Sequence, residues 1–314
     1  MTKYKTNIHN IDAVILWVNG NDDKHIIKIS NYVDNKSEIS LTKFRTRFDQ
    51  VNEIKFTIDS ILKFSPYIEN IHIITDEQTP EFLEKIDNND YYKKVSIVDH
   101  KVVFKDFEQF LPTFNCRPIE TCMHRIPGLA EHFIYFNDDF FLIKHTKPTD
   151  FFRNGLPVLR GKWLKFDKDI FYKKFKKIRV GHKKAQQKAA QLVGLKKYYN
   201  FKHTPHPLRK STFKTYFNNN PNILIENIKY RFRNENQFTP QGLANHIEIK
   251  NKSCVLISDL ELLYMRSYTK PLFWIKFIFL LNGNKKRFLG LQSLDQCPSN
   301  TLKFLTKWIE NRLN

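Results

Sequence analysis

The sequence predicts an α/β protein built on a doubly wound, mostly parallel sheet. Over the first 140 residues, short apolar runs alternate with segments in which apolar residues recur at helical spacing. This alternation is typical of a parallel sheet whose two faces are covered by helices. Each run also stops at a polar residue, as expected where strands end in loops. Apolar residues make up 41% of the 314-residue chain, which is enough for a large core and excludes intrinsic disorder.

The apolar periodicity places the elements in order. The expected strands are 12–18, 68–75, 95–98 and 133–136, and the expected helices between them are 52–64, 80–86 and 119–126. Ser65-Pro66 ends the first of these helices. Residues 165–197 are rich in Ala, Gln and Lys, and we expect them to be helical with breaks at Gly181 and Gly194. The last helix, 299–313, is amphipathic.

The charge of the chain predicts an acidic partner. Its net charge is +20, and residues 160–214 alone hold 18 basic and two acidic residues, a net +16. Such a segment would attract a polyanion or an anionic surface. A nucleic-acid-binding protein would explain the charge but not the acids at successive strand ends, so we expect no nucleic acid.

Cysteine usage and hydropathy bear on the compartment. The four cysteines form no CxxC pair, and we expect reduced thiols in a cytoplasmic protein. Residues 1–10 lack the apolar segment of a signal peptide. The longest apolar run, 271–281, is too short to span a bilayer, and we expect it to be core. Peripheral contact with the inner face of the cell membrane stays open.

Acids at strand ends are the first functional signal. Asp22, Asp76, Asp99 and Asp138 each follow an expected strand, and in open α/β sheets ligands bind at this edge. Adjacent carboxylates at Asp138 and Asp139 could hold Mg²⁺ (or Mn²⁺), which prefers oxygen ligands. The competing interpretation is a solvated turn.

Two further motifs could carry chemistry. His203-Thr-Pro-His206-Pro-Leu-Arg209 holds two imidazoles that could accept a proton near neutral pH, although surface histidines in a basic face are an equal alternative. Zinc lacks a third and fourth ligand at a recognisable spacing. Arg233 could pair with phosphate oxygens, or Arg231-Phe-Arg233 could be a strand edge. No P-loop, GxGxxG or GxSxG motif is present.

These strings together resemble the Stealth family of sugar-1-phosphate transferases, bacterial capsule and exopolysaccharide enzymes related to the animal GlcNAc-1-phosphotransferase. Its first region resembles residues 11–22 and its long second region resembles segments from 47 to 141. The third resembles His203-Thr-Pro-His206 with Phe232-Arg233-Asn-Glu, and the fourth resembles 288–295. Two departures are Leu16 in place of Thr and Leu291-Gln-Ser in place of Leu-Asn-Asp.

The resemblance implies a Rossmann-like, GT-A-type core, a divalent cation and a set of site residues. The implied catalytic residues are Glu120, Asp139, His203 and Arg233, with His206 as an alternative base, and Asp138 and Asp139 as metal ligands. The nucleotide would meet Asp12, Trp17, Asn19, Gly20 and Asp22. The other substrate-binding residues expected from the matched strings and the sheet edge are Asp76, His100, Asn115, His124, Arg125, Asn137 and Arg209.

The resulting hypothesis is a single catalytic domain over 1–314. Residues 1–150 would form the nucleotide-binding α/β core, 155–202 a basic helical insertion, and 203–314 the rest of the core and site. The protein would move a HexNAc-1-phosphate from a UDP-sugar to a glycan hydroxyl, releasing UMP, and the acceptor could be an anionic phosphodiester polymer. The alternative is a GT-A-type glycosyltransferase that releases UDP.

Overall fold

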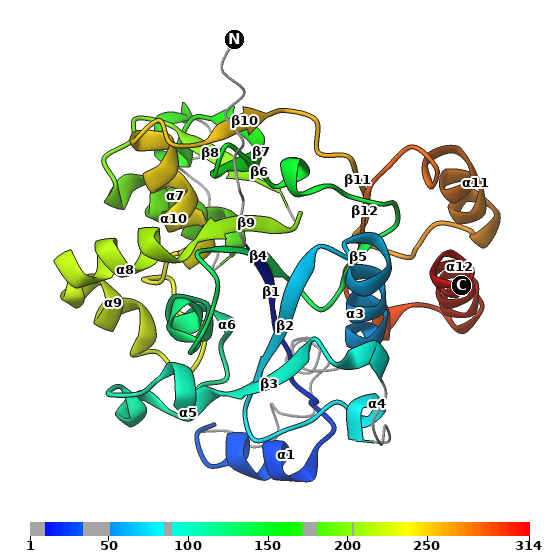
Figure 1. Ribbon diagram of the computed structural model, residues 1–314, viewed down its shortest axis with the longest axis horizontal. Coiled ribbons are helices and arrows are strands. Elements are labelled where there is room, and N and C mark those ends of the chain that lie inside the picture. Colours follow the sequence, from blue (N-terminus) through cyan, green and yellow to red (C-terminus); the bar gives the residue numbers. More distant parts are fainter. Residues whose placement is uncertain (1–9, 34–50, 85–89, 172–180, 203) are drawn as a thin grey trace.

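A five-stranded sheet forms the centre of the molecule (Figure 1). The computed structural model describes residues 10–33, 51–84, 90–171, 181–202 and 204–314. The sheet order is β3-β2-β1-β4-β9; the first four strands are parallel, and β9 runs antiparallel to β4. The order 3-2-1-4 is that of a Rossmann-like half-sheet. The strands are β1 (Ile11–Leu16), β2 (Ile68–Thr75), β3 (Val95–Asp99), β4 (His132–Phe136) and β9 (His206–Arg209).

Alternate residues of β1 face two different cores, which is why this strand is apolar throughout. Val14 packs in the core that contains α6 (Cys116–Cys122), whereas Ala13 and Ile15 pack in the core that contains α3 (Glu53–Phe64). A parallel strand covered on both faces needs such a continuous apolar run. The predicted strands and the helix at 52–64 are therefore confirmed.

The remaining strands form two smaller sheets beside the central one. One has the order β10-β7-β6, with β8 paired to β7, and the other has the order β11-β12-β5. Their bounds are β5 (Phe140–Leu142), β6 (Phe152–Arg153), β7 (Leu156–Leu164), β8 (Tyr198–Phe201), β10 (Val255–Ile257), β11 (Leu262–Met265) and β12 (Phe288–Leu291).

Further helices surround these sheets (Figure 1). The predicted helix 80–86 is present as α4 over its described part, its last two residues lying outside the described residues, and 119–126 is present as α6 followed by a short 3-10 turn. The other helices are α1 (Asp23–Ser30), α4 (Glu81–Glu84), α5 (His100–Val103), α7 (His182–Leu192), α8 (Lys210–Asn219), α9 (Pro221–Ile228), α10 (Pro240–Lys250), α11 (Leu272–Asn282) and α12 (Ser299–Leu313).

The basic insertion is only partly helical. Helix α7 begins after Gly181 and ends before Gly194, which has a positive φ of 77°, so both predicted breaks are confirmed. Strands β7 and β8 pair with each other at the two ends of 155–202, however, and an all-helical insertion is therefore wrong. Residues 156–164 contain only Val158 and Trp163 as strand-favouring residues, and the strand forms because β6, β8 and β10 supply its hydrogen-bonding partners. The domain boundaries themselves stay a prediction.

The terminal helix α12 is amphipathic, as predicted. Leu305 and Ile309 are buried, and Leu302, Trp308 and Leu313 pack against the same core. The expectation of core at 271–281 is wrong, because in α11 only Ile275 and Phe279 are buried. In the described part of the chain, no helix is long and apolar enough to cross a membrane.

A buried carboxylate ties the amino ends of three strands together. Asp12 accepts hydrogen bonds from the Asn70 backbone N–H (3.1 Å), the Asn70 side chain (3.0 Å) and the Ala130 N–H (2.8 Å), and it is fully buried. Its pKa lies below the ordinary value: burial acts to raise it, but the hydrogen bonds to the carboxylate outweigh that effect.

Asp12→Ala should lower the free energy of unfolding by about 3 kcal/mol, because buried N–H groups lose their acceptor. Urea unfolding at pH 7 measures the effect. Asp90→Ala, at a highly exposed acid, is the control and should change stability by less than about 0.5 kcal/mol. Equal losses in the two variants would contradict a structural role for Asp12.

Candidate active site

The first part of the site lies where β1, β2 and β3 end. Asp22, Asp76 and Asp99 lie at this edge of the sheet, as the sequence predicts. Asp22 caps α1 and accepts a hydrogen bond from Gln78 Nε2 (2.9 Å), and Lys28 Nζ pairs with Asp76 (2.8 Å). The three acids therefore organise the loops at this edge.

The loop after β1 is held by a side chain from the loop after β2. Gln78 Oε1 accepts from the Asn19 N–H (2.9 Å), and Gln78 Nε2 donates to the Asn19 carbonyl (3.1 Å). Trp17 and Gly20 are buried beside this contact. Burial lowers the pKa of His100, which follows β3, to about 4, so this imidazole is neutral at physiological pH.

The second part is a group of three carboxylates, two in the turn after β4 and one at the start of α3. Burial raises the pKa of Asp138 to about 6, and burial together with the charge of Asp138 raises that of Asp139 well above its ordinary value. Glu53, the first residue of α3, reaches about 7, mainly through burial and then through Asp138. Thr57 Oγ1 donates to the Asp138 carbonyl (2.6 Å) and fixes the turn against α3. Asn137 begins this turn, its carbonyl accepting from the Phe140 N–H (3.3 Å).

This group has the chemistry of a cation site. Among the described residues, no lysine or arginine forms an ion pair with Glu53, Asp138 or Asp139, so their mutual repulsion is uncompensated. A divalent cation would remove that repulsion, and Mg²⁺ commonly uses one or two carboxylates with waters. Among all the residues that the structure describes, no group of three or more His, Cys, Asp or Glu side chains is arranged so that it could hold a metal ion. Asp138 and Asp139 could supply two carboxylates to such a cation, with waters as the other ligands.

The third part surrounds Glu120 on α6. This carboxylate is 4% exposed and accepts a hydrogen bond from the Tyr135 hydroxyl of β4 (3.0 Å). Burial raises its pKa, while Tyr135 and the charges of Arg117 and Arg233 act in the opposite direction. Arg233 lies over the start of α6, with Nη2 3.7 Å from the Cys116 Sγ. A buried carboxylate is thus flanked by two guanidinium groups.

The loop that carries Arg233 is pinned to α6 by hydrogen bonds. Asn115 caps α6 by accepting from the Arg117 N–H (3.2 Å), and its Nδ2 donates to Gln237 Oε1 (2.7 Å). Arg117 Nη1 donates to the Asn234 carbonyl (3.0 Å). The sequence expectation of a strand edge at 231–233 is wrong, since this segment is an irregular turn.

Strand β4 connects the second and third parts. Tyr135 bonds Glu120 and also lies within the electrostatic reach of Asp138, whose charge contributes to the raised pKa of the tyrosine. On the neighbouring strand, His206 pairs in register with Tyr135, and the two rings stack with centroids 6.5 Å apart. His203, the predicted base, lies outside the described residues.

Four predicted site residues lie elsewhere. Asp12 is at the amino ends of the strands. His124 is buried, its Nδ1 2.9 Å from the Thr121 carbonyl oxygen, and its ring stacks on Phe213. Arg125 pairs with Asp106, and Arg209 forms a two-pronged ion pair with Glu248. The structure does not bring these four side chains to Glu120 or Asp139, because each is already engaged in holding loops or helices.

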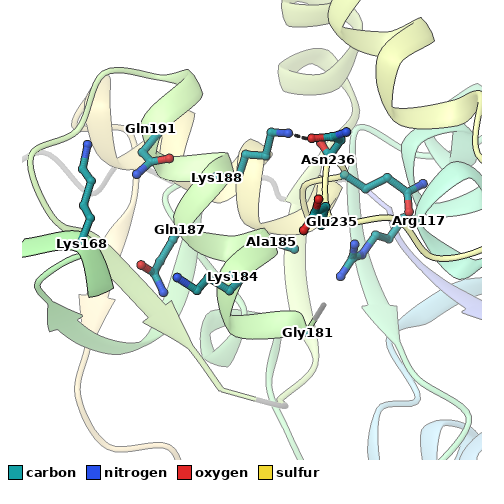
Figure 2. A pocket seen from close by; sticks show the side chains of 11 residues that line it. Arg117, Lys168, Gly181, Lys184, Ala185, Gln187, Lys188, Gln191, Glu235 and Asn236 are labelled. Atoms are coloured by element: carbon teal, nitrogen blue, oxygen red, sulfur yellow. Dashed lines mark hydrogen bonds between the residues drawn. The ribbon is translucent and has the colours of Figure 1, made fainter. Parts of the chain in front are cut away.

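A cavity of about 350 Å³ lies between α7 and the loop at 235–237 (Figure 2). Arg117, Lys184 and Lys188 line it, against one acid, Glu235. Lys188 Nζ donates across the cavity to the Asn236 carbonyl, as Figure 2 shows. The charge of Arg117 also acts to lower the pKa of Glu120, so this basic cavity adjoins the third part of the site.

Comparison with known proteins identifies the family. Residues 47–160 match the model of Stealth protein CR2, conserved region 2. This chain belongs to the Stealth family. The region matched contains α3, β4, Glu120 and the acids after β4. The family expected from the sequence is therefore confirmed.

Several curated relatives carry phosphotransferase names. The chain is 31% identical over 237 residues to capsular polysaccharide phosphotransferase cps1A of Actinobacillus pleuropneumoniae, covering 72% of this chain and 62% of the relative. It is 35% identical over 211 residues to LcbA of Neisseria meningitidis, covering 65% and 55%. It is 40% identical over 149 residues to exopolysaccharide phosphotransferase cps2G of Lactiplantibacillus plantarum, covering 47% and 41%. This Stealth chain thus spans about two fifths to three fifths of these relatives.

Solved structures that match include the galactosyltransferase LgtC, at 11% identity and a TM-score of 0.48, with 95% of each chain covered. Mouse xyloside xylosyltransferase 1 matches at 9% identity and a TM-score of 0.43, covering 90% of this chain and 97% of that one.

Sequence reasoning missed several residues of this Stealth site. Glu53, Arg117 and Tyr135 lie within the matched strings or beside them, but nothing in the sequence marks them as site residues. A glutamate opening a helix and a tyrosine in an apolar strand are ordinary in sequence, and only their burial against other ionisable groups distinguishes them. For Tyr135 the one signal in the sequence is its place in the Tyr-Phe-Asn-Asp-Asp string, two residues before Asn137.

Glu53→Gln should make the Stealth chain more stable at pH 8, by about 2 kcal/mol, and should flatten its stability between pH 4.5 and 7. The folded protein holds the Glu53 proton up to about pH 7, whereas the unfolded chain loses it near 4.5, so stability falls as pH rises through this window. Urea unfolding in the presence of a chelator measures it.

Glu310→Gln, at an exposed glutamate of α12, is the matched control. It should leave the pH dependence unchanged. A Glu53→Gln profile that keeps the slope of the parent protein would show that the carboxylate ionises normally.

Proposed function

We propose that this protein transfers a sugar-1-phosphate, HexNAc-1-phosphate in the first instance, from a UDP-sugar to a hydroxyl of a capsular or surface glycan. The observation that carries the proposal is that one strand, β4, connects two groups of carboxylates: its Tyr135 bonds the buried Glu120 of α6, and the turn that follows it holds Asp138 and Asp139. Relatives named capsular polysaccharide phosphotransferases support the reaction class.

The reaction forms one bond and breaks one. The acceptor oxygen bonds to the phosphorus that carries the sugar. The bond between that phosphorus and the oxygen that bridges it to the uridine-bearing phosphorus breaks, so a phosphodiester forms and UMP leaves with the bridging oxygen. The hydroxyl proton passes to a base. Little covalent chemistry is asked of the protein, and catalysis then depends on position and on neutralising charge.

Glu120 is the base that burial favours among the described residues. Its raised pKa brings a carboxylate nearer to the operating pH, where a general base is most effective. Tyr135 fixes the carboxylate by its hydrogen bond, and His206 backs the tyrosine ring. His203 and His206 remain the alternatives expected from sequence. In either case Arg233 would pair with the phosphoryl oxygens.

Asp138 and Asp139 would hold Mg²⁺ or Mn²⁺, which when bound neutralises phosphate charge and orients the leaving group. Thr57 holds the turn that carries the two aspartates. When ionised, the buried Glu53 adds negative charge beside them, and a bound cation would favour that ionised form.

The acceptor is proposed to be an anionic phosphodiester polymer. The cavity lined by Arg117, Lys184 and Lys188 has the charge to hold a phosphodiester of the acceptor chain beside Glu120. Because nucleotide sugars are the donors, the proposal places the protein in the cytoplasm, in peripheral contact with the inner face of the cell membrane.

Incubation with Mg²⁺, a glycan primer and a panel of UDP-sugars should release UMP with one donor, only when primer is present. Asp139→Asn should abolish release, and Arg233→Lys should lower kcat by about 100-fold or more, because a planar two-pronged contact becomes a single point charge. Chromatographic separation of UMP from UDP is the measurement.

Arg266→Lys, at an exposed arginine, is the matched control for Arg233→Lys and should keep full activity. Release of UDP in place of UMP would favour the alternative, a GT-A-type glycosyltransferase, and would remove the phosphoryl-transfer roles of Glu120 and Arg233. Full activity of Arg233→Lys would remove that residue alone.

Charge reversal at the cavity tests the acceptor. Lys184→Glu with Lys188→Glu should shorten the polymer made per binding event and weaken its salt dependence, because the growing chain is held less firmly. Gel analysis of product length at several salt concentrations measures it. Lys196→Glu with Lys197→Glu, outside the cavity lining, is the control, and equal shortening there would mean that only overall charge matters.

A further inference from the structure

Helix α11 presents a broad apolar face to solvent. Of the fifteen large apolar side chains that are exposed in the described residues, five lie on this one helix. Phe273 is 69% exposed and Leu280 76%, and the other three exceed 45%. The five side chains are Phe273, Trp274, Phe277, Leu280 and Leu281.

These side chains form one continuous face. At 100° per residue they fall within an arc of about 120°, opposite the buried Ile275 and Phe279. Soluble helices usually place polar residues on the outer side. An outer face built of Trp, Phe and Leu instead marks an interaction surface.

The helix is firmly seated by its inner side. Phe279 packs edge-to-face on Trp308 of α12, with ring centroids 4.9 Å apart, and on Phe304 at 5.8 Å. Gly283 allows this approach, since a Cβ there would lie 2.6 Å from the Trp308 ring. Figure 1 shows α11 at one end of the molecule beside α12. The apolar face is therefore part of the folded structure.

The charges around the helix identify what it contacts. Residues 262–294 contain six basic side chains and no acidic one. Lys270 precedes the helix, Lys285 and Lys286 follow it, and Lys276 lies at the edge of the apolar face, over the Phe304 ring. No acid among the described residues forms an ion pair with any of these four lysines. Apolar side chains framed by basic ones are complementary to an anionic membrane surface.

We propose that α11 is an interfacial helix that attaches this protein to an anionic lipid bilayer. The helix lies parallel to the bilayer, with its five exposed apolar side chains among the lipid chains and the lysines at both ends against the head groups. The absence of acidic residues over the 33 residues 262–294 favours an anionic membrane, whereas a protein partner would not require it. This attachment does not depend on the reaction proposed above.

The test is co-sedimentation of the full chain with vesicles of phosphatidylcholine containing about 30% phosphatidylglycerol. Phe273→Ser/Phe277→Ser/Leu280→Ser should lower the partition coefficient roughly tenfold or more, since three large apolar side chains no longer enter the bilayer. Ile27→Ser/Leu256→Ser, at exposed apolar positions elsewhere, should bind like the parent. Pure phosphatidylcholine should bind the parent protein less, and high salt should reduce binding.

A second measurement does not depend on how well the triple variant folds. The tryptophan emission of the parent should shift to the blue with anionic vesicles, and Trp274→Phe should bind equally but lose most of that shift. Undiminished binding of a folded triple variant, or an unchanged blue shift in Trp274→Phe, would overturn the proposal. So would a parent dimer that the triple variant dissociates, because a second copy would then cover α11. Assays without sugar donors keep this result separate from the reaction.

Discussion

The pairing of β4 between β1 and β9 is the constraint on which the site depends. Its side chains alternate between two cores, with Phe133 and Tyr135 on one side and Ile134 and Phe136 on the other. This alternation leaves no freedom of register, because a shift by one residue would turn Tyr135 away from Glu120. The same register sets where the chain leaves the sheet and delivers Asp138 and Asp139.

Acidic and basic side chains form separate groups around this strand, an arrangement that lowers stability but suits the binding of charged ligands. Glu53, Asp138 and Asp139 lie close enough for their charges to raise pKa values within the group, and none has a basic partner among the described residues. The charges of Arg117 and Arg233, by contrast, both act on the buried carboxylate of Glu120. Buried like charges raise the pKa of carboxylates and lower stability near neutral pH. Binding of a cation and of a phosphate would compensate both sets of charges.

Apolar runs were enough to predict the four parallel strands of the central sheet, because a strand covered on both faces has few alternatives to a continuous apolar sequence. They did not predict β9, the antiparallel strand at its edge. The edge occupied by Asp22, Asp76 and Asp99 followed from topology alone. Long-range contacts could not be predicted in this way. The sequence predicts that Arg209 binds substrate, but in the structure it forms an ion pair with Glu248, 39 residues away.

The apolar run at 271–281 shows a second limit of prediction from sequence. Apolar content states that a side chain can be buried, but it does not state that the protein supplies a cover, and here only one side of α11 is covered. Six residues connect strand β11 to this helix, and the charge of Asp139 contributes to the raised pKa values of Tyr264 and Tyr268. A membrane held against α11 would therefore lie a short stretch of chain from the carboxylates after β4, and the position of that helix would set the distance between the bilayer and the proposed site of transfer.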